Sequence, residues 1–182
     1  GVFTQQQARR AGRVIDAIWN QYPRFTELEV RSHLARFGYR GEEVFKDCAS
    51  LSGGELARIM LALKNVLAEN DHVGSLVFDE VDTGVSGRAA QKVAEKLAQV
   101  SRRKQVLCVT HLPQLAAMAD THFSVEKGER GGRTYTHVAR LDRPGREQEL
   151  SRLMAGSALT DALRQSAAEL LSRAEEYRAG LK

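Results

Sequence analysis

Residues 75–110 read SLVFDEVDTGVSGRAAQKVAEKLAQVSRRKQVLCVT, and this stretch decides the fold. It begins with the short apolar run Ser75–Phe78 and ends with a second such run, Gln105–Thr110. Continuously apolar runs of this length are typical of strands that are buried on both faces. The residues between them place apolar side chains at helical spacing, namely Ala89, Val93, Leu97 and Val100. Strand, helix and strand in this order predict an α/β protein with a parallel sheet flanked by helices.

Upstream of this stretch the sequence predicts a small helical lobe. Apolar residues at helical spacing indicate a helix over residues 9–21, which Pro23 stops. Thr26 and Glu29 have the spacing of a capping box, so they begin a second helix, and Gly38 ends it. We therefore expect a lobe of two short helices joined by a turn.

Downstream, Pro113 suits the first turn of another helix. Residues 122–127 and 133–141 alternate in character around the glycine-rich residues 128–132, which predicts a hairpin at a sheet edge. Apolar residues from Leu150 onward return to helical spacing and predict a helical tail.

Composition limits the class of protein. The 182 residues suffice for one domain, or for one domain with a small lobe. The net charge of +4 is spread along the chain, so charge alone does not establish nucleic-acid binding. Cys48 and Cys108 lack the spacing of a zinc site or a disulfide framework. No membrane span or signal peptide is evident, so we expect a cytoplasmic protein without membrane contact.

The segment Leu51–Glu55 reads LSGGE and lies where a helix that ends near Asn70 begins. Ser52 and Glu55 form a second capping box. Free backbone amides gather at a helix start, and Gly53 and Gly54 allow a phosphate to approach the backbone closely. This pattern predicts an anion site formed by these four residues. The alternative is an ordinary capped helix in which Ser52 satisfies its own amides.

A pair of acids, Asp79 and Glu80, follows the first apolar run. The carboxyl ends of parallel strands are the edge at which α/β sheets bind ligands. There Asp79 is suited to hold Mg²⁺ through water, and Glu80 to act as the general base toward an attacking water. The alternative is a pair of solvated acids at a strand end.

Two further residues follow these strands. His111 comes directly after the second run, where a histidine can donate a hydrogen bond to a terminal phosphate. Asp82 opens the segment Asp82-Thr83-Gly84, whose alternative interpretation is a plain turn. A lone histidine is usually a surface or core residue, so the position of His111 after a second predicted strand is what supports a role.

In their order along the chain, these segments resemble the signature motif, Walker B motif, D-loop and switch histidine of ABC-type ATPases. From Ser52 to about residue 177 the sequence resembles the C-terminal part of the RecN family of DNA-repair proteins, which are relatives of the SMC proteins. The stretches that carry this resemblance are SGGELARIMLALK, FDEVDTGVSGRAAQKVAEKL, QVLCVTHLPQLAAMADTHFSVEK and RLMAG. The resemblance implies the signature-side half of an ABC/SMC-type P-loop ATPase head, over residues 52–182.

The family resemblance also implies roles and partners. ATP and Mg²⁺ would be the cofactors, and Asp82 would lie at the surface where two heads meet and couple one site to the other. Ser52, Gly53 and Gly54 of one head would close over ATP held by a second head, giving an ATP-dependent dimer. In this family the Walker A loop lies in an N-terminal segment, and the cycle is linked to DNA during double-strand-break repair.

Residues 1–51 resemble a different group, the corresponding lobe of the ribosome-associated ABC-F ATPases. On that resemblance Gln5 falls at the Q-loop, where a glutamine touches Mg²⁺ and the attacking water, although an exposed glutamine is an equally good interpretation. Beyond the signature the ABC-F pattern is lost, because Val81-Asp82-Thr83-Gly84 stands where that family has proline, threonine and asparagine. The chain is therefore either a RecN-like head with an unusual lobe or a fusion joined near the signature.

No glycine in the chain is followed by lysine and then serine or threonine, so this chain has no Walker A loop. ATPase activity is expected only when a Walker A segment complements it. Three functions remain open from the sequence: an ATP-operated DNA clamp of RecN type, an ABC-F translation factor, and a non-catalytic interaction module. Residues 82–87 favour the first over the second, and the missing loop keeps the third open.

Overall fold

The computed structural model describes residues 12–70, 74–79, 82, 85–130, 132–155 and 160–181. The chain divides into two compact units, Gly1–Thr110 and His111–Lys182. The lobe and the strand–helix–strand segment thus lie in one unit. The boundary expected between residues 51 and 52 falls inside that unit and stays a prediction.

The lobe is helical, as expected. It contains α2 (Val14–Trp19), α3 (Glu27–Ala35) and two short 3-10 turns, η1 (Gly41–Phe45) and η2 (Cys48–Ser50). The capping box at α3 is confirmed, because the Thr26 amide donates to Glu29 at 2.7 Å and the Glu29 amide donates to the Thr26 hydroxyl at 3.3 Å. The lobe buries an apolar set comprising Val14, Ile15, Ile18, Val30 and Leu34.

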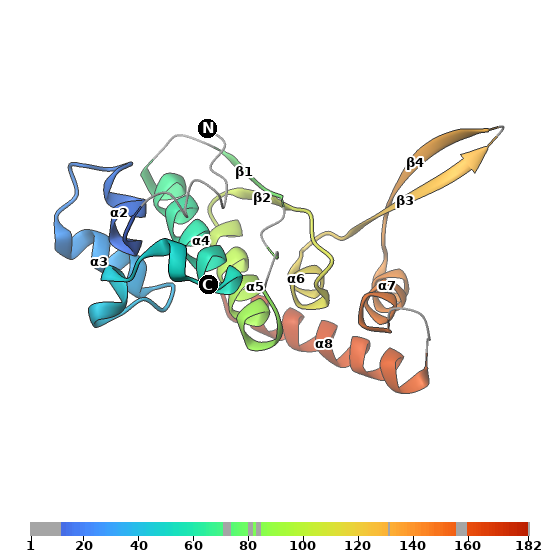
Figure 1. The fold of residues 1–182 in the computed structure, drawn as a ribbon. Helices are drawn as coiled ribbons and strands as arrows, with labels where there is room; N and C mark the ends of the chain where they lie inside the picture. Colours follow the sequence, from blue (N-terminus) through green and yellow to red (C-terminus); the bar gives the residue numbers. More distant parts are fainter. Residues whose placement is uncertain are drawn as a thin grey trace. The chain divides into compact units, whose positions relative to one another are not determined.

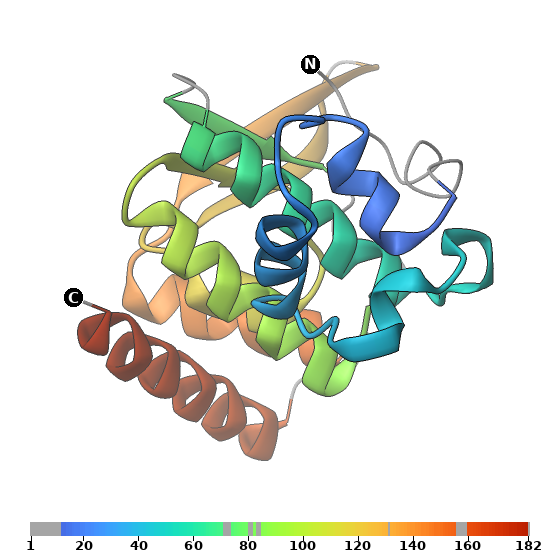
Figure 2. The same cartoon turned by 90° about the vertical axis from the view of Figure 1, so that its left-hand side faces the viewer.

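The helix predicted to begin at Ser52 is α4 (Gly53–Asn70). Its apolar side buries Leu56, Ile59 and Met60. It packs against α2 and α3 of the lobe and against α5 (Gly87–Ser101). Figure 2 shows the lobe helices lying against α4. Helix α4 therefore lies between the lobe and α5 of the same unit.

The predicted parallel sheet is present as two strands, β1 (Ser75–Phe78) and β2 (Gln105–Cys108). Val77 pairs with Leu107 and Phe78 with Cys108. Helix α5 packs against β2, and Figure 1 shows α4 and α5 on the same side of the sheet. Phe78, which is 1% exposed, belongs to the covered face.

The expectation that both strands are buried on both faces is wrong for the described residues. Val77, Leu107 and Val109 alternate with the covered positions and are 60%, 52% and 66% exposed. The physical reason is that the described helices of this unit cover one side of the sheet. We call the surface formed by these three residues the open sheet face.

The described residues of the second unit form a hairpin and three helices. These are α6 (Pro113–Met118), β3 (Phe123–Arg130), β4 (Arg133–Arg140), α7 (Arg143–Ala155) and α8 (Asp161–Gly180). Strand β3 continues three residues beyond its predicted end and β4 ends one residue earlier than predicted, and within the described residues the two strands form an antiparallel sheet of their own. The three helices pack on one another. Among the helices that the structure describes, each is too short or too polar to span a bilayer.

Candidate functional site

The start of α4 is accessible. Ser52 is exposed, and Gly53, Gly54 and Glu55 are half-buried. The predicted capping box is confirmed: the Ser52 amide and hydroxyl donate to the Glu55 carboxylate at 2.9 and 2.7 Å, and the Glu55 amide donates to the Ser52 hydroxyl at 3.4 Å. The hydroxyl bond and then the amide bond from Ser52 lower the pKa of the Glu55 carboxyl. The geometry suits a phosphate-facing helix start, and the anion site itself stays a prediction.

Two residues that sequence reasoning missed, Tyr39 and Arg58, meet beside this helix start. The Tyr39 hydroxyl donates to the backbone carbonyl of Glu55 at 2.7 Å. The guanidinium carbon of Arg58 lies 5.2 Å from the centroid of the Tyr39 ring. The sequence contains no periodic signal for this contact, because Tyr39 and Glu55 are 16 residues apart.

Asp79 is exposed directly after β1, at the carboxyl edge of the sheet. The role of Asp79 as the magnesium residue stays a prediction. Among the described residues no group of three or more histidine, cysteine or carboxylate side chains is arranged to hold a metal. A magnesium ion held largely through water needs few protein ligands, so Asp79 fits that kind of site. Glu80 and Gln5, the predicted base and Q-loop residue, lie outside the described residues.

Asp82 differs from the expectation that it lies at the surface. Asp82 is only 4% exposed, and its carboxylate accepts a hydrogen bond from the Thr110 hydroxyl at 2.5 Å. The Val85 amide donates to the Asp82 carbonyl at 3.0 Å, which closes a turn. The Thr110 hydroxyl, two residues after β2, supplies a donor to this carboxylate, and burial of a polar group is tolerated where such a partner is present. The role of Asp82 between two heads stays a prediction.

His111 is exposed and begins the second unit. It lies just ahead of α6, whose C-terminal carbonyls are held by two arginines. Arg146, on α7, donates to the carbonyls of Ala117 and Ala119 at 3.0 and 2.8 Å. Arg178, on α8, donates to Ala119 at 2.7 Å. These contacts fix the helix that follows His111.

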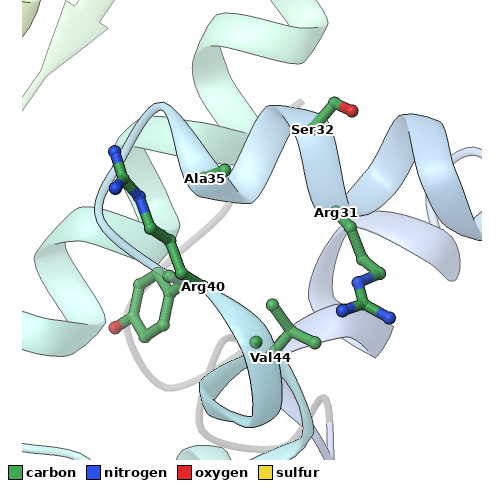
Figure 3. A pocket seen from close by; sticks show the side chains of 7 residues that line it. Arg31, Ser32, Ala35, Arg40 and Val44 are labelled. Carbon is green, nitrogen blue, oxygen red and sulfur yellow. The ribbon is translucent and has the colours of Figure 1, made fainter.

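A shallow hollow of about 220 Å³ on the lobe is a second place to look for a ligand. It is lined by Arg31, Ser32, Ala35, Tyr39, Arg40, Gly41 and Val44. Figure 3 shows the guanidinium groups of Arg31 and Arg40 on opposite sides of the hollow, so they do not converge on one anion. Arg31 is also engaged with Glu27 at 3.2 Å. The start of α4 is therefore the better candidate.

The sequence of this chain is similar to that of known proteins. No family model matches the chain. The chain is similar to proteins named DNA repair protein RecN: it is 50% identical over 127 residues to that of Bacillus subtilis (strain 168) and 46% identical over 138 residues to that of Mycobacterium leprae (strain TN). These matches cover 70% and 76% of this chain. The chain spans only 22% and 23% of the length of those relatives.

Two solved structures also show similarity. One comes from work on ATP-driven dimerization and DNA-stimulated activation of SMC ATPases, with a TM-score of 0.49, 22% identity, and coverage of 60% of this chain and 65% of that one. The other is an SMC head bound to the C-winged helix domain of ScpA, with a TM-score of 0.47, 16% identity, and coverage of 77% and 51%.

Proposed function

Because about 70% of this chain is RecN-like in sequence, we propose that it forms the signature-side part of an SMC-like ATPase head that acts in DNA double-strand-break repair. The observation that carries this proposal is the 50% identity over 127 residues to a RecN protein. An identity of this size supports a common fold and a common chemistry of the matched part. The chain spans only about a fifth of the length of its relatives, so the activity of the whole assembly is also a proposal.

The first partner in this proposal is an N-terminal segment that carries a Walker A loop. The chain has no such loop of its own. The open sheet face supports the idea, since Val77, Leu107 and Val109 expose apolar area that parallel sheets normally cover. A segment that supplies both the phosphate loop and a cover for this face would complete the site and the core together.

The second partner is another head, which would hold the ATP that this signature closes over. The start of α4 supports this arrangement, because Ser52 is exposed and Gly53 and Gly54 are only half-buried. In the proposed closed state Ser52, Gly53 and Gly54 contact the phosphates through backbone amides and the Ser52 hydroxyl. ATP would thereby join two heads, and hydrolysis would separate them.

The remaining residues would act at the carboxyl edge of the sheet. Mg²⁺, when bound, neutralises phosphate charge. Asp79 would orient the water molecules of the ion, Gln5 would approach the same waters, and Glu80 would take a proton from the attacking water. His111 would donate a hydrogen bond to the terminal phosphate, and Asp82 would relay the state of one head to the other. DNA would be the polyanion that the assembled protein binds.

A non-catalytic interaction module is the second candidate. The observation in its favour is that Ser52 and Glu55 satisfy each other within the chain, as in an ordinary capped helix. When the chain is combined with a Walker A segment, an ATPase head should hydrolyse ATP, whereas an interaction module should form a complex without hydrolysis.

The test is to produce this chain together with the N-terminal part of a RecN protein and to measure phosphate release from ATP and Mg²⁺. We expect the mixture to hydrolyse ATP and to do so faster with linear double-stranded DNA, whereas each part alone is inactive. A stable complex without ATP turnover would favour the interaction module. Stimulation by ribosomes in place of DNA would favour the ABC-F alternative.

A further inference from the structure

The turn that ends α3 determines the position of Tyr39. The Gly38 amide donates to the Ala35 carbonyl at 3.1 Å, and the Tyr39 amide donates to the Leu34 carbonyl at 3.2 Å. Gly38 has a φ of +92°. This pattern is a Schellman motif, which reverses the chain and packs the residue after the glycine beside the last turn of the helix. Tyr39 is consequently 2% exposed, with Leu34 fully buried.

From this position the Tyr39 hydroxyl contacts the first turn of α4. It donates to the Glu55 carbonyl at 2.7 Å. A carbonyl there also accepts the helical amide four residues further on, and it has two lone pairs, so the hydroxyl adds a second bond without breaking the helix. The lobe is thereby joined to the backbone of the signature segment and not merely to its side chains.

Arg58, one turn further along α4 than Glu55, contacts the ring of Tyr39. Its guanidinium carbon lies 5.2 Å from the Tyr39 ring centroid, a cation–π distance. A Cβ built on Gly38 would approach the Arg58 Nη1 atom to 3.0 Å, which the flexible arginine side chain can relieve, so the positive φ is what requires glycine here. Gly38 therefore shapes the turn that places Tyr39, and Arg58 lies over the Tyr39 ring.

We propose that Tyr39 and Arg58 are positioning residues that hold the first turn of α4 in the orientation at which Ser52, Gly53 and Gly54 meet a phosphate. This inference rests on the proposed function and assigns the lobe a part in it. Neither residue touches the nucleotide. A displacement of α3 would reach the signature through Tyr39, so the lobe sets how readily the signature closes over ATP.

The test compares Tyr39→Phe, which removes only the hydroxyl, with Tyr135→Phe, which changes a tyrosine that is 52% exposed in the hairpin of the other unit. Amide hydrogen exchange is followed residue by residue in this chain. We expect exchange of the Leu56 and Ile59 amides to become about two- to tenfold faster in Tyr39→Phe, the effect of losing one ordinary hydrogen bond. The Tyr135→Phe protein should match the original chain.

Exchange at α4 that stays unchanged in Tyr39→Phe overturns the proposal. An equal acceleration throughout the unit also overturns it, because it would mean general loss of stability and not local positioning. Arg58→Gln is the second variant and should accelerate the same amides.

The reconstituted ATPase supplies a separate measurement. Tyr39→Phe should raise the ATP concentration at half-maximal rate by about two- to tenfold with little change in the maximal rate, since a poorly held signature closes less readily. Faster exchange with unaltered ATP dependence would overturn the link to the site. An inactive original assembly would instead reject the proposed function, and the exchange result would still decide whether the contact orders α4.

Discussion

The Thr110 hydroxyl donates a hydrogen bond to the Asp82 carboxylate and so joins the end of β2 to the turn that follows β1. Asp82 is buried, so the Thr110 hydroxyl satisfies a carboxyl oxygen that is largely shielded from water. Near the carboxyl edge of the sheet, the chain thus buries an acid that the family resemblance had placed at the surface where two heads meet.

Replacing Thr110 by valine should lower the free energy of unfolding by about 1–3 kcal/mol, the usual cost of leaving a buried acceptor without its donor. Thr110→Ser keeps the hydroxyl and should lose much less. Urea denaturation of this chain measures both. Equal stability of the valine and serine proteins would show that the bond contributes nothing.

Arg146→Met should destabilise the second unit, because it retains much of the apolar stem and removes the donors to Ala117 and Ala119. We expect a loss of about 1–3 kcal/mol, the cost of leaving a buried carbonyl without its partner. Arg164→Met is the control, since Arg164 is 68% exposed and its contact with Asp161 is 3.9 Å long. That control should change stability by less than about 0.5 kcal/mol.

Acid should weaken the start of α4. The pKa of Glu55 is lowered in the folded chain by its bonds to Ser52, from an ordinary value of 4.5. A group with a lowered folded pKa stabilises the fold above its unfolded pKa, and this contribution is lost as the pH falls through the folded pKa. Melting temperatures measured from about pH 7 down to about pH 3 should therefore fall less steeply for Glu55→Gln than for the original chain. Parallel curves would refute this assignment.

Polar substitutions on the open sheet face should separate folding from assembly. Leu107→Ser together with Val109→Thr changes side chains that are more than half exposed, so the unfolding free energy should move by less than about 0.5 kcal/mol. Binding to the N-terminal part of a RecN protein should weaken at least about tenfold, because buried methyl groups would be lost from the interface. Titration calorimetry checks the affinity, and unchanged binding would place the partner elsewhere.

Glu80→Gln should slow ATP turnover of the reconstituted protein about 100-fold or more, the usual effect of removing a general base. The ATP-held dimer should persist, since the amide retains the shape of the side chain. Phosphate release and size-exclusion chromatography with ATP measure the two effects. Normal turnover in this variant would remove Glu80 from the mechanism.

The locally encoded parts of this structure were predictable. Both capping boxes, Thr26 with Glu29 and Ser52 with Glu55, are confirmed because their spacing of three residues determines their geometry. The parallel pairing of β1 and β2 is confirmed for a similar reason, since a crossover helix of this length permits little else.

The parts that depend on distant contacts were not predictable. An apolar run shows that a strand avoids water but not which chain covers it, so the exposure of Val77 was missed. The burial of Asp82 depends on Thr110, which is 28 residues away. Strand β3 extends through Gly128, which pairs with Tyr135 and is not among the glycines of positive φ, whereas Gly132 in the turn has a φ of +73°.

The open sheet face also determines how the chain would fare in a cell that made too much of it. Three apolar side chains displayed on a sheet are the kind of surface that chaperones retain and proteases clear. If the proposed N-terminal segment covers this face, copies of the chain without that segment would therefore be short-lived.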